Sequence, residues 1–324
     1  MAEPGGSTEL KDEGLPLTAL AVAAGRAVEA SRPDPLVADP YASALVVAAR
    51  SHLDLPTVWP AQPAEAAPLQ QPLLLASIYI GMRTRFIDDF LQSGSPTLQT
   101  VVLGAGLDTR AFRLAWPAGA RVFELDSANV LEFKAHVLSR LSAEPGCEVI
   151  PLGADLSLPW REPLLATGFD PGQPTTWVLE GVLPYLDAAA QHAALGEIAA
   201  LSSSGSRAVI ERAVPIPKTD DMDTKLREFS EKTGLPMSQL LARADPPDPV
   251  ELLEAAGWRC NASSVEDLCS KYGRVLSLDP ATDAGVGAPE AEQPQAEQAG
   301  PETRGQDTHG QDQSRGGFVT AWLP

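Results

Sequence analysis

From about residue 100 onward, short runs of β-branched and apolar residues alternate with longer stretches of helical periodicity. The runs predict strands at Thr100–Leu103, Arg121–Leu125, Glu148–Leu152, Thr176–Leu179, Arg207–Ile210, Trp258–Val265 and Gly317–Leu323. Helices are predicted between them, at Thr109–Leu114, Ser127–Leu141, Leu158–Thr167, Ala188–Ser202 and Val250–Ala256. Such alternation is typical of a doubly wound α/β sheet.

The residues before this region have a different pattern. After a frayed start (1–16), they predict three helices, over Leu17–Glu29, from Asp39 to about Arg50 with Pro40 in the first turn, and over Leu73–Leu91. We therefore expect a helical cap (17–98) followed by an α/β domain (99–278).

Two segments interrupt the alternation. Residues 215–249 contain six prolines and are long enough to form a lid. Residues 279–316 hold eight acidic residues, two arginines and one aliphatic residue larger than alanine, so they cannot bury enough apolar surface to offset their ordering entropy. We expect a disordered acidic insertion, after which 317–324 supply the final strand.

Composition narrows the classes of function. Hydrophobic residues make up 44% of the chain, but no apolar run approaches the roughly 20 residues of a membrane helix. The net charge of −19 disfavours nucleic acid as a partner. The acidic N-terminus lacks the features of a secretory signal, and the three cysteines form no metal-ligand cluster. We expect a cytoplasmic protein without a membrane partner or a metal site.

The first strand ends in the glycine turn Gly104-Ala105-Gly106. Glycine lets a turn tighten and lets a ligand approach the backbone, next to the amides of a following helix. Open α/β sheets bind nucleotide-like cofactors in this way. Thr109 stands where the dinucleotide fingerprint has its third glycine, so the turn by itself is a weak signal.

Acidic residues close three further strands. Asp126 ends the second strand about 20 residues after the turn, a spacing at which an acid can bind a ribose. Asp155 and Leu156 follow the third strand and suit an adenine, and Glu180-Gly181 follows the fourth. A solvated acid, a turn and a helix cap are the alternative interpretations, but four such features at one sheet edge favour a cofactor site.

The chain resembles class I S-adenosylmethionine-dependent methyltransferases, and more narrowly a leucine carboxyl methyltransferase-like family of bacterial methyltransferases. The resemblance extends from Thr18 to Trp322, outside the proline-rich loops and the acidic insertion. It rests on TALAVAAGRAVEASRPDPLVADPYA, MRTRFIDDFL, LGAGLDTRAFRLAWP, VFELDSANVLEFKAHVL, Asp155-Leu156, WVLEGVLPYL, YGR and FVTAW. Where family members carry E-V-D-x-P, this chain has Ser-Ala after Asp126, and Pro184 precedes Tyr185.

The resemblance implies roles for individual residues. Gly104 and Gly106 border the methionine part of S-adenosylmethionine, Asp126 binds the ribose, and Asp155 with Leu156 frames the adenine. An arginine of the preceding helix, Arg83 or else Arg85, binds the cofactor's carboxylate, and Glu180 also contacts the cofactor. The resemblance further implies that the seventh strand is antiparallel.

The predicted reaction is O-methylation of a carboxylate or a hydroxyl group, on a small molecule or a protein C-terminus. A carboxylate needs no base, whereas a hydroxyl usually does. None of the four histidines is placed to supply one, which favours an already anionic acceptor oxygen, or else a base from Glu180 or the lid. Tyr185 is a further candidate catalytic residue. An NAD-dependent oxidoreductase and a cofactor-binding protein without transfer activity are the alternatives. The identity of the acceptor and the oligomeric state stay open.

Overall fold

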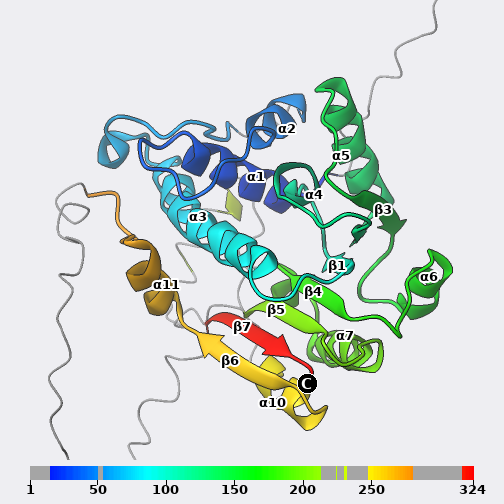
Figure 1. Cartoon of the computed structure of the whole chain (residues 1–324). Coiled ribbons are helices and arrows are strands. Elements are labelled where there is room, and N and C mark those ends of the chain that lie inside the picture. The colour runs from blue at the N-terminus through cyan, green and yellow to red at the C-terminus, as the bar shows by residue number, and fades with distance from the viewer. Residues whose placement is uncertain (1–14, 50–53, 213–223, 225–229, 232–246, 280–315) are drawn as a thin grey trace, which may run out of the picture.

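The computed structural model describes residues 15–49, 54–212, 224, 230–231, 247–279 and 316–324. Within them, seven strands form one sheet (Figure 1). They are β1 Gln99–Leu103, β2 Arg121–Asp126, β3 Glu148–Gly153, β4 Thr175–Leu179, β5 Arg207–Arg212, β6 Arg259–Ser263 and β7 Gly317–Trp322. The predicted lid and acidic insertion lie mostly outside the described residues.

The strand order is β3-β2-β1-β4-β5-β7-β6. The five strands from β3 to β5 are parallel, while β7 is antiparallel to both β5 and β6. This confirms the predicted α/β sheet with an antiparallel last strand. It also brings the carboxyl ends of β1, β2, β4 and β5 to one edge, where open α/β sheets bind ligands.

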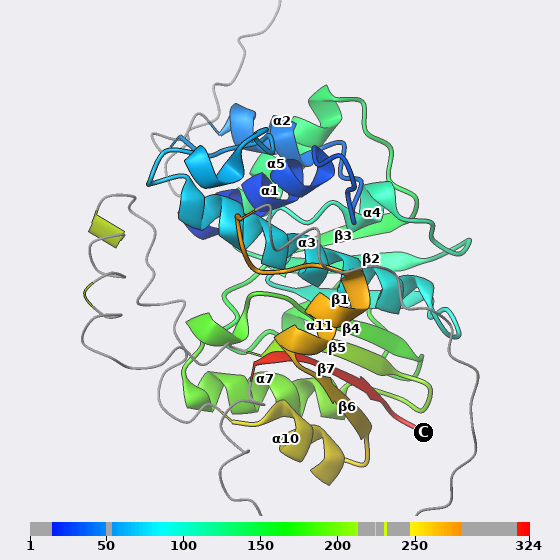
Figure 2. The same cartoon turned by 90° about the vertical axis from the view of Figure 1, so that its left-hand side faces the viewer.

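Helices cover both faces of the sheet. Their bounds are α1 Leu17–Ala30, α2 Ala42–Ala48, α3 Gln71–Gln92, α4 Arg110–Arg113, α5 Ala128–Arg140, α6 Arg161–Ala166, α7 Ala188–Ala200, α10 Pro249–Ala255 and α11 Val265–Tyr272, with 3-10 turns η1 Pro63–Glu65 and η2 Leu183–Tyr185. Figures 1 and 2 show α1 and α3 on one side of the sheet and α7 and α10 on the other. No helix in the described part of the chain is long and apolar enough to cross a membrane.

Alternation along the strands divides the core between the two faces. Val101 and Leu103 of β1 pack with Trp177 and with residues of α6, α7 and α10. Val102, between them, faces the other way and packs with Met82 of α3. A third cluster joins α1, α2 and α5, and α1 also lies along α3. The N-terminal helices are thereby fixed over the edge at which β1 ends.

Several predicted boundaries were wrong. The helix expected from Leu158 begins at Arg161, and capping explains two others. The helix expected from Asp39 begins at Ala42, because the Asp39 carboxylate accepts hydrogen bonds from the amides of Tyr41 and Ala42 at 3.1 Å and so leaves Pro40 outside the helix. The sixth strand does not reach Val265. Ser264 and Asp267 form a capping box that starts α11 there.

Candidate active site

The glycine turn after β1 is held to β2 by its own backbone. The amides of Gly104 and Ala105 donate to the carbonyl of Leu125, at 2.8 and 2.9 Å, and the amide of Gly106 donates to Asp126 Oδ2 at 2.7 Å. The sequence predicted that a ligand would lie on the backbone of this turn, against the amides of a following helix. These three amides are instead bonded within the protein, and α4 begins only at Arg110. The turn shapes the site through its tight backbone rather than through free amides.

Both glycines of the turn adopt the left-handed conformation, with φ of +69° at Gly104 and +47° at Gly106. A Cβ on Gly104 would lie 2.4 Å from Val182 Cγ2, whereas a Cβ on Gly106 would meet nothing closer than 3.9 Å. Gly104 is therefore required both by its backbone conformation and by the close approach of the loop after β4. Gly106 is required by its conformation alone.

A first pocket, of about 570 Å³, lies beside the turn where β2 and β3 end. Gly104, Asp126, Asp155 and Leu156 line it, four of the residues predicted from the sequence. Asp126 accepts one backbone amide on each carboxylate oxygen, from Gly106 and from Ser127, both at 2.7 Å. A carboxylate oxygen has two lone-pair sites, so Asp126 is fixed in place and can still accept further hydrogen bonds.

A second pocket, of about 710 Å³, adjoins the first and shares those four residues with it. Its walls include apolar residues of α1 and α3, and η2 contributes Pro184 and Tyr185. Arg83, Gly106 and Glu180 line it too, whereas Arg85 does not. Arg85 is half exposed and pairs with Asp89 at 2.7 Å. Of the two arginines that the sequence left open, the structure brings only Arg83 to the site.

Arg83 lies between two glutamates that close neighbouring strands. Its Nε donates to Glu180 at 2.7 Å, and its Nη1 donates to Glu211, at the end of β5, at 3.1 Å. Glu211 also accepts from the amide of Gly181 and from the hydroxyl of Tyr79, both at 2.7 Å. The strand-end acid of β5 thus belongs to the site as much as that of β4.

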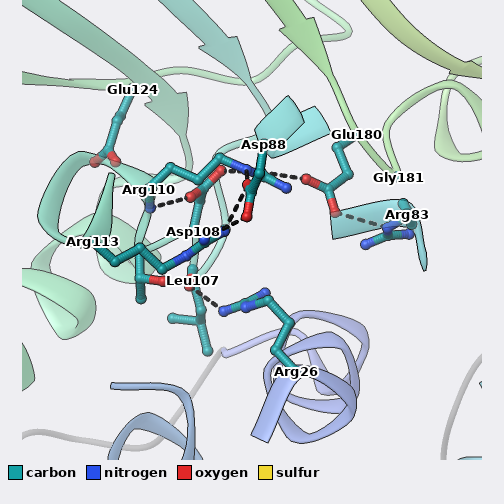
Figure 3. A network of polar contacts seen from close by, with 12 residues as sticks. Arg26, Arg83, Asp88, Leu107, Asp108, Arg110, Arg113, Glu124, Glu180 and Gly181 are labelled. Atoms are coloured by element: carbon teal, nitrogen blue, oxygen red, sulfur yellow. Dashed lines mark hydrogen bonds and ion pairs between the residues drawn. The ribbon is translucent and has the colours of Figure 1, made fainter. Parts of the chain in front are cut away.

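Figure 3 shows that Glu180 is shared with a second arginine, Arg110 of α4. Arg110 is buried and also bonds to Asp88 of α3 at 2.7 Å and to Asp108 at 2.6 Å, and Arg113 joins Asp88 from its other side. We call these seven residues the ion network: Arg83, Asp88, Asp108, Arg110, Arg113, Glu180 and Glu211. It ties α3 to the sheet edge, and four of its members line the second pocket: Arg83, Asp108, Glu180 and Glu211.

The network decides the charge of Glu180. Burial by itself raises the pKa of this carboxyl, but Arg110 and Arg83 outweigh burial and hold the pKa below its usual range. Burial also raises the pKa of Asp108, but the neighbouring cations, chiefly Arg110, outweigh it and lower this pKa strongly. Glu180 is accordingly a fixed negative charge and a weak proton acceptor.

Sequence reasoning missed Tyr79, Arg110 and Glu211. Tyr79 and Arg83 are four residues apart and share one face of α3, and Glu211 ends β5 as Glu180 ends β4. The spacing of Tyr79 and the strand-end position of Glu211 could both have been recognised in the sequence. Thr109, at the position of the missing third glycine, is buried and donates to Asp39 at 2.8 Å, so it anchors the cap to the loop after the turn.

Comparison with known proteins places the chain in a family. The profile of leucine carboxyl methyltransferases matches residues 19–199. The chain belongs to this family. It is 38% identical over 266 residues to a protein of Saccharopolyspora erythraea, covering 82% of this chain and 90% of that one. It is 39% identical over 262 residues to a protein of Mycobacteroides abscessus, covering 79% and 83%. The names of both relatives provisionally assign them as S-adenosyl-L-methionine-dependent methyltransferases.

The protein is thus an S-adenosylmethionine-dependent methyltransferase, and its site fits that cofactor in charge. The ion network contains four carboxylates and three guanidinium groups, so it carries one net negative charge. S-adenosylmethionine has a sulfonium, an ammonium and a carboxylate, hence one net positive charge. A buried charge is stable only when it is compensated, and a cofactor bound beside the network would compensate its charge.

Proposed function

We propose that the protein transfers the methyl group of S-adenosylmethionine to an oxygen atom, of a carboxylate or a hydroxyl group, on a small molecule or a protein C-terminus. The observation that carries this proposal is the second pocket. Its lining includes the glycine turn and apolar residues of α1 and α3, and we call the part lined by these apolar residues the chamber. Tyr79, Glu180 and Glu211 line the same pocket and bring oxygen atoms to it. The carboxyl group in the family's name also favours an oxygen acceptor.

We assign the cofactor to the residues of both pockets. Asp126 Oδ1 accepts both the amide and the hydroxyl of Ser127, whereas Oδ2 accepts only the amide of Gly106, so Asp126 would bind a ribose hydroxyl chiefly through Oδ2. Asp155 and Leu156 would frame the adenine, with Asp155 oriented by Ser157, whose amide and hydroxyl donate to it at 2.9 and 2.6 Å. Gly104 and Gly106 would border the methionine part.

Arg83 would bind the cofactor's carboxylate, and the negative charge of Glu180 would lie near its cationic groups. When bound, the cofactor supplies an electrophilic methyl group, whose bond to sulfur breaks as the acceptor oxygen forms a bond to it. The chain's own task is to align the two partners and exclude water. The helices α1 and α3, which wall the chamber, serve the second purpose.

Tyr185 was predicted as a catalytic candidate. It lies in η2 with Pro184 in the first turn, where the missing amide hydrogen is tolerated. Burial raises the pKa of Tyr185, and a hydrogen bond with Thr18 of α1 partly offsets the increase. Because this contact joins α1 to the loop after β4, we propose that Tyr185 helps to close the chamber.

Radiolabelled S-adenosylmethionine tests the proposal. The protein is incubated with the labelled cofactor and an extract of its native cells, and the labelled product is analysed by mass spectrometry. Label in a methyl ester or a methyl ether supports the proposal, and alkaline release of methanol separates the two, because only the ester hydrolyses readily. Label on nitrogen, carbon or sulfur would refute it.

A further inference from the structure

The chamber differs in chemistry from the residues assigned to the cofactor. Its walls are apolar and come from two helices of the N-terminal region, with Ala19 and Val22 from α1 and Leu73, Ala76 and Ile80 from α3. Tyr79 and Glu211, which are hydrogen-bonded to each other, line the same pocket. An occupant must therefore be largely apolar and carry one polar group that suits this pair.

Tyr79 presents a neutral hydroxyl with acceptor capacity. Its own proton is committed to Glu211, since Tyr79 Oη donates to Oε1 at 2.7 Å. Burial, and next the nearby Glu211 carboxylate, hold the pKa of Tyr79 well above its ordinary value. The lone pairs of Oη can therefore accept a hydrogen bond, which a hydroxyl group can donate and a carboxylate cannot.

The charges around the pocket also favour a hydroxyl acceptor over a carboxylate. The ion network, with its one net negative charge, is already compensated once the cofactor is bound. The other buried pairs nearby, Arg26 with Asp39 and Lys134 with Glu124, are each balanced within themselves. An acceptor carboxylate would add an uncompensated negative charge to this region, and an uncharged acceptor would add none.

Arg212 is a cation that could instead favour an acceptor carboxylate. It lines the second pocket, but its Nη2 donates to the carbonyl of Gly316 at 3.4 Å. Burial lowers its pKa, and Asp248 acts against that decrease. Arg212 thus has a backbone partner next to β7 and a nearby carboxylate, Asp248, that offsets part of its charge.

Resting on the proposed O-methyl transfer, we propose that the acceptor is an uncharged, largely apolar molecule whose hydroxyl group donates a hydrogen bond to Tyr79 of the Tyr79–Glu211 pair. The same contact gives the hydroxyl proton a destination. As the acceptor oxygen gains the methyl group, its proton moves to Tyr79 Oη and the Tyr79 proton moves to Glu211 Oε1. The tyrosine stays neutral, and the glutamate ends as a carboxylic acid.

Two probes with one ring system separate hydroxyl from carboxylate acceptors: 2-naphthol and 2-naphthoate. Their binding is measured by calorimetry on full-length protein saturated with sinefungin, an unreactive cofactor analogue with the same net charge as S-adenosylmethionine. We expect 2-naphthol to bind at least tenfold more tightly than 2-naphthoate. We also expect Tyr79→Phe to weaken 2-naphthol about fivefold or more without changing the affinity for 2-naphthoate. In Glu211→Gln, which removes the excess negative charge, the preference for 2-naphthol should shrink.

Tyr272→Phe is the matched control, because Tyr272 bonds to Asp89 outside the pocket. It should leave both affinities unchanged. Equal or tighter binding of 2-naphthoate, no binding of either probe, or unchanged 2-naphthol affinity in Tyr79→Phe would each overturn the inference. Failure of sinefungin itself to bind would instead refute the proposed function on which the inference rests.

Discussion

Alanine substitutions at Gly104 and Gly106 separate two requirements of the glycine turn, the left-handed backbone conformation and the close packing against Val182. The left-handed conformation costs an L-residue about 1–2 kcal/mol at either Gly104 or Gly106. Only at Gly104 does the new methyl group also meet Val182, at 2.4 Å, and forcing an extra methyl group into packed surroundings costs about 1–3 kcal/mol. We expect Gly104→Ala to lose about 2–5 kcal/mol and Gly106→Ala about 1–2 kcal/mol.

Thermal unfolding measures this difference, since 1 kcal/mol corresponds to about 2–4 °C in the melting temperature of a protein of this size. Gly104→Ala should melt several degrees below Gly106→Ala. It should also lose more affinity for adenosylhomocysteine, because Gly104 and Val182 both line the second pocket. Equal melting temperatures, or a lower one for Gly106→Ala, would refute the packing argument.

Three further outcomes follow from the structure. Asp126→Ala should weaken adenosylhomocysteine binding tenfold to a hundredfold in calorimetry, because a hydrogen bond to a charged group is worth about 1.5–3 kcal/mol. Unchanged affinity in a folded variant would show that Asp126 does not belong to the site. Phe318→Ala, which deletes a fully buried ring packed on Phe86 with centroids 4.7 Å apart, should cost about 3–5 kcal/mol in urea unfolding, whereas Trp322→Ala at the exposed end of β7 should cost far less. Burial raises the pKa of Cys147 to about 12 and of Cys260 to about 11. Because the thiolate is the reactive form, alkylation of these two cysteines by iodoacetamide should be slow at pH 8 and its rate should still increase above pH 9.5. A rate that levels off near pH 9 would show that the thiols have ordinary pKa values.

The sequence predicted the sheet well because each strand is a short apolar run bounded by turn residues, and local pattern suffices for that. The antiparallel β7 came from the family resemblance rather than from periodicity. The capping box at Ser264 was a readable signal, and reading it would have ended β6 at the right residue.

The ion network was harder to predict, because its partners are far apart in the sequence. Arg83 and Glu211 are separated by 128 residues, and Arg110 and Glu180 by 70. Which strand-end acid meets which arginine depends on the strand order and on where α3 crosses the sheet. Composition and spacing do not encode that arrangement locally, so Arg83 and Glu180 could each be proposed, while their contact with each other and the part played by Glu211 could not.

The central claim, that this sheet edge is built for S-adenosylmethionine, is tested most directly by calorimetric titration of the full-length protein with adenosylhomocysteine and, separately, with NAD. We predict one adenosylhomocysteine site per chain with micromolar affinity and no measurable binding of NAD. Binding of NAD without adenosylhomocysteine would contradict the account.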